Sequence, residues 1–430
     1  MKGIVGVVLA AGEGKRMKSA MPKVLHMLWG RPLLWYVLTA LEEAGIEKII
    51  CVVGHKPELV KEYLAHFQKN SRTNLRIETV IQKELLGTAD ALYRTKKRLA
   101  NFDGTIMAAY ADAPLVKTET LRSLIALHIK EGVACSILSA HIKDPTGYGR
   151  IMRNDEGEVI KIVEEKEASL YQKVVSEINS GTYCFNAKKL FYVLDELMVK
   201  ARKGEYYLTD TIELLKKHKE RIATYVSDEP YEIIGINSRK DLSFAYDIMR
   251  NRILEQFMSK GITVIDPHTT FIDYNVRIGE ETVIYPFVYI ETDVTIGKYC
   301  SIGPFCRLRS GTVIEDNAKI GNFVEITRSH IKNKTKINHF SYIGDAFVGS
   351  NVNIGAGTIT ANYNGVAKNK THIGNHAFIG SGTVLVAPVK IGNWAVTGAG
   401  CVVPKGKDVP DKTVVVGVPA RVLKKRSYPR

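Results

Sequence analysis

Ten aliphatic residues stand six positions apart, without a gap, in the last third of this chain. They are Ile272, Ile278, Ile284, Ile290, Ile296, Ile302, Leu308, Ile314, Ile320 and Ile326. A period of six fits neither an α-helix nor a simple two-faced strand, and it is the hexapeptide period of a parallel β-helix. In such a fold short strands form the flat faces of a prism, and one aliphatic side chain per face points inward. The period predicts this fold for the last third of the chain.

The aliphatic ladder continues beyond these ten residues with interruptions. It slips by one residue before Ile331 and again before Val348, and residues 360–372 break it. Gly often follows the aliphatic residue, where we expect the prism to turn a tight corner. The fifth residue of each hexad is small or branched, so Cys300 and Cys306 are expected to fill the core. Regular hexads build the prism, and we expect the interruptions to mark a surface site.

The preceding residues alternate buried runs with amphipathic stretches. Predicted strands cover residues 4–9, 49–53, 77–81, 105–109 and 134–139, and predicted helices cover 33–43, 58–67, 89–99 and 118–129. That order indicates an α/β domain with a mostly parallel sheet. The helical period of residues 238–260, with Ser238 as N-cap and Gly261 as stop, predicts a connecting helix. We therefore expect three parts: an α/β domain at 1–237, a linker helix at 238–261, and a β-helix with a C-terminal tail at 262–430.

Composition restricts the class of protein further. A chain of 430 residues is too long for a single hydrophobic core, so more than one domain is expected. No apolar run reaches membrane-spanning length. Six scattered cysteines without a C-x-x-C pair favour a reducing cytoplasm over a disulfide framework or a zinc site. The formal net charge of +15 suits anionic partners such as nucleotides, sugar phosphates and coenzyme A. Because the basic residues are dispersed and not interleaved with aromatics, nucleic-acid binding is not expected.

A Gly-rich turn follows the first predicted strand. Gly12 and Gly14 let backbone N–H groups approach an anion, and Lys15, Arg16 and Lys23 add positive charge for a polyphosphate. The spacing matches neither the Walker A motif nor the dinucleotide-binding G-x-G-x-x-G. The combination L-A-A-G-x-G-x-R-M followed by P-K resembles nucleotidyltransferases that join a sugar 1-phosphate to a nucleoside triphosphate.

Further motifs follow in order along both parts of the chain. They lie at residues 110–115, 148–150, 164–166, 177–181, 204–210 and 235–237, and, in the β-helix, at 322–325, 339–345, 353–358 and 362–365. Together with the ladder, they resemble one bifunctional family over the whole chain: N-acetylglucosamine-1-phosphate uridylyltransferase / glucosamine-1-phosphate N-acetyltransferase. The resemblance implies a Rossmann-like mixed sheet and a left-handed parallel β-helix. It also implies synthesis of UDP-N-acetylglucosamine, a precursor of bacterial cell-wall polymers, from UTP, acetyl-CoA and glucosamine 1-phosphate by way of N-acetylglucosamine 1-phosphate.

The resemblance assigns roles in the first domain. Asp112, at the carboxyl edge of the sheet, and Asn237 would hold Mg²⁺, while Arg16 and Lys23 would neutralise the triphosphate and the leaving pyrophosphate. Gln82 would read the uracil. The other residues implied to bind substrate are Leu9, Ala10, Ala11, Gly12, Gly87, Thr88, Gly149, Glu164 and Asn179.

A second set of roles falls on the β-helix. His339 would be the general base that deprotonates the amine of glucosamine 1-phosphate, Glu325 would orient its ring, and Asn362 would stabilise the developing oxyanion. Sugar phosphate would be bound by Arg309, Tyr342, Asn353 and Lys368, and acetyl-CoA by Asn362, Tyr363, Ser381 and Ala399. Because a β-helix has no internal pocket, its sites must lie on the surface. The resemblance to hexapeptide acyltransferases implies a homotrimer with sites between subunits.

The chain departs from the family pattern at several positions. Leu85 stands where a second Gln is usual, and Gly-Thr-Ala-Asp-Ala at 87–91 replaces Gly-Thr-Gly-His-Ala, so that Ala89 and Asp90 leave the choice of base and sugar open. Thr327, followed by Arg328, replaces a phosphate-binding Lys. Ala111 replaces the Gly before the metal-binding Asp, and Arg421 is a candidate contact for coenzyme A near the C-terminus.

Three alternatives stay open at the level of sequence. One is a related hexose-1-phosphate nucleotidyltransferase with another base or sugar. Another is a metal hydratase of the β-helix type, which needs three converging histidines; the candidates are His330, His339, His372 and His376. The third is a β-helix that only trimerises the enzyme.

Overall fold

The computed structural model describes residues 3–71, 73–199 and 205–423, and the chain divides into two compact units between Tyr246 and Asp247. The division falls within helix α8 (Arg239–Met258), where the sequence predicts a linker helix. Ser238 caps it as predicted, since its Oγ accepts a hydrogen bond from Asp241 N at 3.2 Å. The predicted domain boundaries at residues 237 and 261 stay a prediction.

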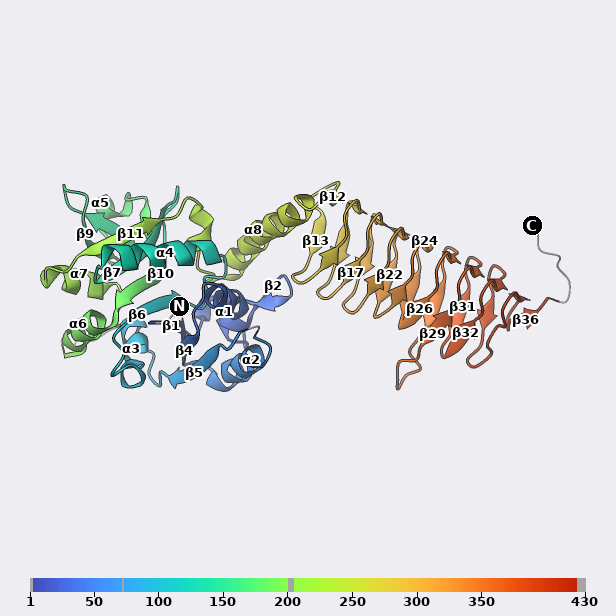
Figure 1. Cartoon of the computed structure of the whole chain (residues 1–430), viewed down its shortest axis with the longest axis horizontal. Coiled ribbons are helices and arrows are strands. Elements are labelled where there is room, and N and C mark those ends of the chain that lie inside the picture. The colour runs from blue at the N-terminus through green and yellow to red at the C-terminus, as the bar shows by residue number, and fades with distance from the viewer. Residues whose placement is uncertain (1–2, 72, 200–204, 424–430) are drawn as a thin grey trace. The chain divides into compact units, whose positions relative to one another are not determined.

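The first unit is built on a mixed sheet with the order β11-β7-β10-β6-β1-β4-β5 (Figure 1). Its strands are β1 (Ile4–Ala10), β4 (Lys48–Val53), β5 (Arg76–Ile81), β6 (Thr105–Tyr110), β7 (Cys135–His141), β10 (Glu177–Asn186) and β11 (Ile222–Val226), with β8 (Arg150–Arg153) and β9 (Val159–Val163) beside β10. Strand β10 runs antiparallel to β6 and β7, and the other pairs along this order are parallel. The five predicted strands are confirmed.

Helices pack on the sheet of this unit, and a short hairpin of β2 (Met27–Leu28) and β3 (Arg31–Pro32) precedes the first of them. The helices are α1 (Leu33–Glu43), α2 (Pro57–Lys69), α3 (Thr88–Tyr93), α4 (Thr118–Glu131), α5 (Leu170–Lys173), α6 (Ala187–Val199) and α7 (Asp210–Lys217). The predicted helix at 89–99 is wrong in its second half, because α3 ends at Tyr93. The buried Thr95 hydroxyl donates to Leu92 O at 2.7 Å, and only a 3₁₀ turn follows.

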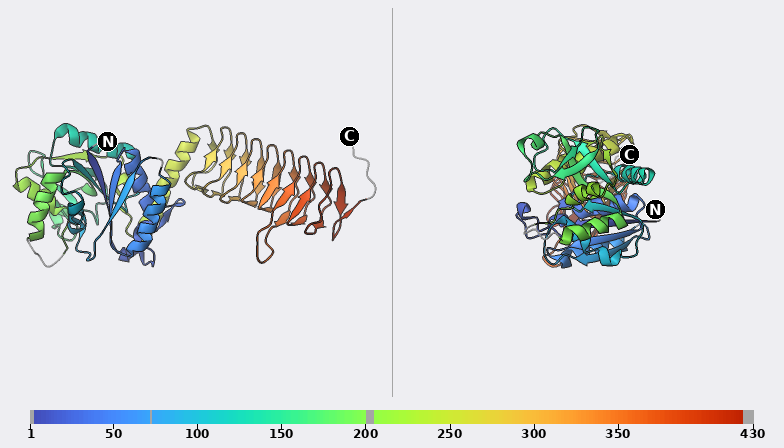
Figure 2. Two further views of the ribbon diagram at one scale, coloured as in Figure 1. Left: turned by 60° about the horizontal axis from the view of Figure 1, so that its bottom comes forward. Right: turned by 90° about the vertical axis from the view of Figure 1, so that its left-hand side faces the viewer.

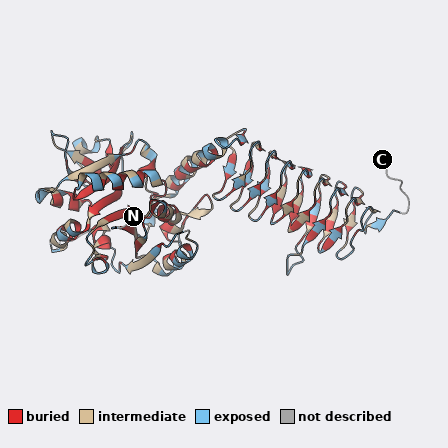
Figure 3. Cartoon of the chain, in the orientation of Figure 1, coloured by how far each residue is buried: buried red, intermediate tan, exposed pale blue. Residues whose placement is uncertain are grey.

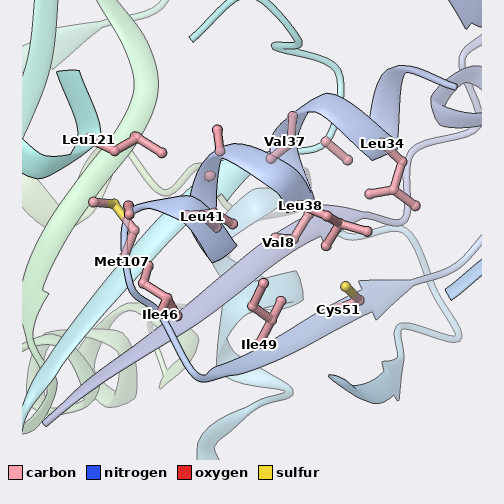
Figure 4. Close-up of a cluster of buried hydrophobic side chains, with 14 of the residues drawn as sticks. Val8, Leu34, Val37, Leu38, Leu41, Ile46, Ile49, Cys51, Met107 and Leu121 are labelled. Atoms are coloured by element: carbon pink, nitrogen blue, oxygen red, sulfur yellow. The ribbon is translucent and has the colours of Figure 1, made fainter. Parts of the chain in front are cut away.

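The sheet of the first unit carries a hydrophobic core on each face. Alternating residues of β1 divide between the two cores, with Val8 in one and Val7 in the other. Figure 4 shows Val8 beneath Leu38 and Leu41 of α1, all fully buried. Each such side chain contributes about 2 kcal/mol by its removal from water. The two cores hold β1 and β6 rigidly, so the loops at their carboxyl ends have a fixed base.

The second unit is a parallel β-helix of three faces, whose coils stack along the prism in Figures 1 and 2. The first face contains β12 (Thr263–Val264), β15 (Val283–Ile284), β18 (Ser301–Ile302), β21 (Lys319–Asn322), β24 (Lys336–His339), β27 (Asn353–Ile354), β30 (Phe378–Ile379), β33 (Val396–Thr397), β35 (Val414–Val416) and β36 (Arg421–Val422). The second contains β13 (Thr270–Ile272), β16 (Val288–Ile290), β19 (Arg307–Leu308), β22 (Glu325–Thr327), β25 (Tyr342–Gly344), β28 (Ile359–Ala361), β31 (Val384–Val386) and β34 (Val402–Val403). The third contains β14 (Arg277–Ile278), β17 (Thr295–Ile296), β20 (Val313–Ile314), β23 (His330–Ile331), β26 (Ala346–Val348), β29 (Thr371–Ile373) and β32 (Val389–Ile391).

The aliphatic ladder forms the interior of this prism, as predicted. Ile290 pairs with Leu308 one coil on, and Leu308 pairs with Ile326; all three are fully buried. Figure 3 shows the same inward stripe as buried residues repeating along the prism. Each slip of phase shortens a coil by one residue: Ile326 pairs with Ile343 across the first slip, and Tyr342 pairs with Ile359 across the second. Cys300 and Cys306 are buried and free, in agreement with a packing role.

The frequent Gly of the hexads has a different cause from the one predicted. Many corner residues with positive φ are non-glycine residues, such as Phe305 (φ 52°) and Phe323 (φ 54°), and of the hexad glycines that follow an aliphatic residue of the ladder only Gly303 (φ 100°) has a positive φ among the described residues. The Gly instead allows adjacent coils to approach closely: a Cβ on Gly321 would lie 1.9 Å from Asn338 O. The expectation that these glycines supply conformational freedom at the corners is therefore wrong, except at Gly303.

Candidate active sites

A cavity of about 480 Å³ opens at the carboxyl edge of the first unit's sheet. Neighbouring strands β1 and β6, which pair Leu9 with Tyr110, bring the Gly-rich turn and the loop of Asp112 to the same edge. The cavity brings together nine residues predicted for this site: Leu9, Ala10, Ala11, Gly12, Lys23, Gln82, Gly87, Thr88 and Asp112. Lys15, expected to add positive charge for a polyphosphate, and Leu85 also line it. So do Glu205 and Tyr207, which the sequence did not single out as binding residues.

Two oxygen atoms converge on one cation in this unit. The Lys23 ammonium donates hydrogen bonds to Asp112 Oδ2 and, at 2.9 Å, to Asn237 Oδ1. The side chain of Asp112 is mostly buried, and Asn237 is held by backbone contacts, because its N–H donates to Asp241 Oδ2 at 2.9 Å. The residues predicted to hold a metal thus lie together around a positive charge. The predicted Arg16 is exposed on the 3₁₀ turn Lys15–Met17 and does not line the cavity.

Three more predicted residues form a cluster: Gly149 just before β8, Glu164 just after β9, and Asn179 on β10. Asn179 N donates to Gly149 O at 2.9 Å, and a Cβ on Gly149 would lie 3.7 Å from Glu164 Oε1. Thr209, which the sequence did not single out as a functional residue, donates from its hydroxyl to Glu164 Oε1 at 2.9 Å. Burial raises the pKa of Glu164, and the Thr209 hydrogen bond partly opposes that rise. The cluster therefore contains one carboxyl group, that of Glu164, whose pKa depends on its burial and on the Thr209 hydrogen bond.

In the second unit, His339 is exposed at the end of β24. Its Nδ1 lies 3.3 Å from Asn322 Oδ1, on the neighbouring strand β21. Glu325, predicted to orient this ring, instead accepts a hydrogen bond from Arg309 Nη1 at 3.0 Å. The structure therefore places Asn322 in the orienting position, because β21 and β24 are adjacent on the first face whereas β22, which carries Glu325, belongs to the second.

A chain of polar contacts connects Arg328 to Asn362. Arg328 binds both carboxylate oxygens of Asp345, at 2.7 Å and 2.8 Å, and Asp345 Oδ2 in turn accepts a hydrogen bond from Asn362 Nδ2. The Arg328 guanidinium holds the pKa of Asp345 below its usual range. Tyr342 Oη lies 3.5 Å from Asn362 Nδ2. Thr327 is buried, so it is unavailable to a substrate.

The remaining predicted residues lie along the prism surface. The loop between β28 and β29 projects from the prism in Figures 1 and 2 and carries Tyr363 and Lys368, which form an isolated bridge. Ser381 and Ala399 occupy equivalent exposed corners of successive coils, where Gly400 N donates to Ser381 O at 2.7 Å. Asn353 is half-buried on β27. Arg421 is exposed at the start of β36.

The histidines considered for a metal hydratase have other contacts. His330 Nε2 lies 2.7 Å from Glu315 Oε1, His372 stacks on Phe347, and His376 stacks on Trp394. Among residues 3–71, 73–199 and 205–423, no three His, Cys, Asp or Glu side chains are grouped to hold a metal ion. None of the helices in the same ranges combines the length and apolar character needed to cross a membrane.

Fold and sites together define a class, that of nucleotidyltransferases joined to a hexapeptide-repeat transferase. The family model for nucleotidyl transferases matches residues 5–231, and the model for the bacterial transferase hexapeptide (six repeats) matches residues 275–310 and 370–405. Several similar proteins carry the name bifunctional protein GlmU, among them the following three. The one from Acetivibrio thermocellus is 39% identical over 457 residues, covering 99% of this chain and 97% of its own. Those from Pelotomaculum thermopropionicum and Lactococcus lactis are each 42% identical, covering 90% and 96% of this chain and 90% and 94% of their own.

The chain belongs to this GlmU family. The prediction of a bifunctional enzyme of UDP-N-acetylglucosamine synthesis, with uridylyltransferase and acetyltransferase activities, is thereby confirmed. The mixed sheet and the left-handed β-helix of hexapeptide repeats are confirmed with it. Membership implies nucleotide-sugar and acetyl-CoA substrates and a divalent metal at the nucleotidyl-transfer site.

Proposed function

We propose that the first unit, with a boundary at residue 237, catalyses attack by the phosphate oxygen of N-acetylglucosamine 1-phosphate on the α-phosphorus of UTP. A new P–O bond forms at the α-phosphorus, and pyrophosphate leaves with the electron pair of the broken P–O bond. Backbone N–H groups around Gly12 hold the triphosphate, and Lys23 and Arg16 neutralise its charge. Gln82 contacts the base, and Gly149, Glu164 and Asn179 bind the sugar. The Lys23 ammonium between Asp112 and Asn237 is the observation that carries this proposal.

We propose Mg²⁺ as the divalent metal, held by Asp112 and Asn237. The donor set fits, because hard oxygen ligands suit Mg²⁺, which is bound by one or two protein groups and takes its remaining ligands from water and substrate phosphates. The bridging ammonium supports the fit, since both oxygens already face one positive charge. When bound, the metal stabilises the negative charge that develops on the phosphates. Lys23 then becomes available to the leaving pyrophosphate.

We propose that the β-helix, residues 262–430 beyond the linker helix, acetylates glucosamine 1-phosphate before uridylyl transfer. Asn322 Oδ1 accepts a hydrogen bond from the Nδ1–H of His339, so Nε2 is the basic nitrogen that removes a proton from the amine. The amine nitrogen bonds to the thioester carbon, the C–S bond breaks, and the coenzyme A thiolate takes the proton from His339. Asn362 stabilises the oxyanion, with acetyl-CoA along Tyr363, Ser381 and Ala399. The sugar is bound by Tyr342 and Asn353, and its phosphate by Arg309 and Lys368.

Arg328 has a different role from the phosphate-binding Lys that usually stands at position 327. Both carboxylate oxygens of Asp345 bind its guanidinium. We therefore propose that Arg328 positions Asp345 and makes no substrate contact. Because the aliphatic ladder fills the prism, these groups lie on its outer surface, which favours a homotrimer whose neighbouring copy encloses each site. The six free, buried cysteines suit a cytoplasmic location.

Separate loss of the two reactions tests this assignment. Purified His339→Ala is expected to lose acetyl transfer and keep uridylyl transfer, whereas Asp112→Ala is expected to do the reverse. Each reaction is followed separately, by coenzyme A release from acetyl-CoA and glucosamine 1-phosphate, and by pyrophosphate release from UTP and N-acetylglucosamine 1-phosphate with Mg²⁺. The reaction that each variant retains shows that the variant protein is folded. Loss of both reactions in one correctly folded variant would contradict the assignment of two independent sites.

A further inference from the structure

The amide of Gln82 is held in one orientation by the protein itself. Gln82 Nε2 donates two hydrogen bonds, to Asp90 Oδ2 at 2.8 Å and to Gly87 O at 3.0 Å. Both partners are acceptors, since one is a carboxylate oxygen and the other a backbone carbonyl. A Gln82 amide turned by 180° would place Oε1 against two oxygens and leave both without a donor. The nitrogen therefore faces Asp90 and Gly87, and the carbonyl oxygen faces the other way.

Asp90 is itself fixed. Its side chain is almost fully buried, with 3% of the residue exposed, and Arg94 Nη2 lies 2.7 Å from its other oxygen, Oδ1, one helical turn away on α3. The two oxygens of Asp90 are thus divided between Arg94 and Gln82. A buried, ion-paired carboxylate accepts hydrogen bonds and donates none, so it imposes its acceptor character on the amide beside it.

Gln82 lines the nucleotide cavity, whereas Asp90 does not. Within the described parts of the chain, no residue donates a hydrogen bond to Gln82 Oε1. We propose that Asp90 is a positioning residue that makes Gln82 present only a carbonyl oxygen to the base, so that the site selects a base with an imide N–H. This inference rests on the proposed uridylyl transfer and explains its choice of nucleotide.

The protonation of N3 in each pyrimidine determines which base this carbonyl oxygen favours. Uracil and thymine carry a proton on N3 and donate it to a carbonyl oxygen. Cytosine has a lone pair at N3, which repels an acceptor held at the same place and leaves both groups without a partner. Asp90 therefore discriminates against CTP and does not distinguish UTP from dTTP.

Asp90→Asn tests the proposal, because an Asn amide can donate to Gln82 Oε1 and so stabilise the inverted amide. We expect the ratio of kcat/KM for UTP to that for CTP to fall by about tenfold or more, the effect of one hydrogen bond gained or lost. Arg94→Gln is the matched control: it removes the ion-pair partner but keeps the carboxylate acceptor, and its ratio should stay within about twofold of the wild type. Acetyl transfer by the same samples reports on the integrity of the protein.

The outcomes separate this inference from the function on which it rests. A wild-type enzyme without preference for UTP over CTP would overturn the proposed uridylyl transfer. A different result is that the wild type prefers UTP and Asp90→Asn lowers the rates with UTP and CTP equally, without changing that preference. This result would show that Asp90 has only a structural role, and it would overturn the inference. If Asp90→Asn does not fold, Asp90→Ala tests the same ratio, since it removes the acceptor and frees the amide to rotate. Equilibrium binding of UTP and CTP to each variant gives the same ratio without turnover.

Discussion

Replacing Asp345 by Asn tests the polar chain that holds Asn362 in the acetyl-transfer site. In the wild type, the Asp345 carboxylate accepts two hydrogen bonds from Arg328 and one from Asn362. An Asn side chain of the same size offers one acceptor oxygen for these three donors and turns an NH₂ group toward one of them. Either Arg328 or Asn362 then loses its partner. The perturbation is electrostatic and leaves the volume of the side chain unchanged.

The magnitude follows from the exposure of the pair. Hydrogen bonds to charged groups contribute about 1.5–3 kcal/mol when buried, and much less when solvated. Asp345 is 14% exposed but Arg328 is 37% exposed, so we expect a loss of only about 1–2 kcal/mol in the free energy of unfolding. The effect on catalysis is larger, because removing an oxyanion donor costs about 10²–10³ in kcat. In Asp345→Asn the Asn362 amide is retained but no longer held in place, so kcat for acetyl transfer should fall by about 10- to 100-fold.

The assay is steady-state acetyl transfer at saturating acetyl-CoA with varied glucosamine 1-phosphate. The KM for glucosamine 1-phosphate should change little, because Arg309 and Lys368 are intact, and uridylyl transfer should be unaffected. Arg328→Lys is the control, since it keeps the positive charge and the Asp345–Asn362 contact, and its loss should be smaller. A correctly folded Asp345→Asn enzyme with wild-type kcat for acetyl transfer would refute the reasoning.

Three further predictions concern charge and packing. Thr209→Val removes the hydrogen bond that lowers the pKa of Glu164, so the acid limb of uridylyl transfer, in kcat/KM against pH, should move to higher pH; an unchanged limb would contradict the role of Glu164. Burial raises the pKa of Asp273 to about 6, so its contribution to stability falls as pH rises from about 4 to 6. Asp273→Asn should therefore raise the free energy of unfolding in urea by up to about 3 kcal/mol at pH 7.5 and not at pH 4, and equal gains at both pH values would disprove the cause. Ile320→Ala should lower the free energy of unfolding of the β-helix by about 2–5 kcal/mol, and an unchanged urea midpoint would refute the ladder as core.

Much of the fold follows from local pattern. The six-residue period predicts the β-helix because every sixth side chain meets the same interior, and the two phase slips locate the two shortened coils. The α/β order predicts five strands of the sheet. The end of α3 at Tyr93 was missed, because it depends on local hydrogen bonds: both the backbone N–H and the hydroxyl of Thr95 donate to Leu92 O. The reason for the hexad glycines was also missed, since it depends on the coil above.

The candidate sites divide in the same way. Motif residues such as Gly12, Gln82, Asp112 and His339 are recognisable in the sequence, and the structure gathers those of the first unit around one cavity. Their partners are not recognisable. Asn322 beside His339 and Asp90 beside Gln82 are known only from the pairing of strands and the packing of α3.

The sequence by itself therefore determined the class of fold, the family and the residue types available for chemistry, because these depend on period, order and spacing along the chain. Tertiary structure alone decided which nitrogen of His339 is held, where Arg328 is engaged and which face Gln82 presents to a base. Those properties are set by donors and acceptors that meet across strands, coils and helices, and a hydrogen bond has a direction that sequence spacing does not record.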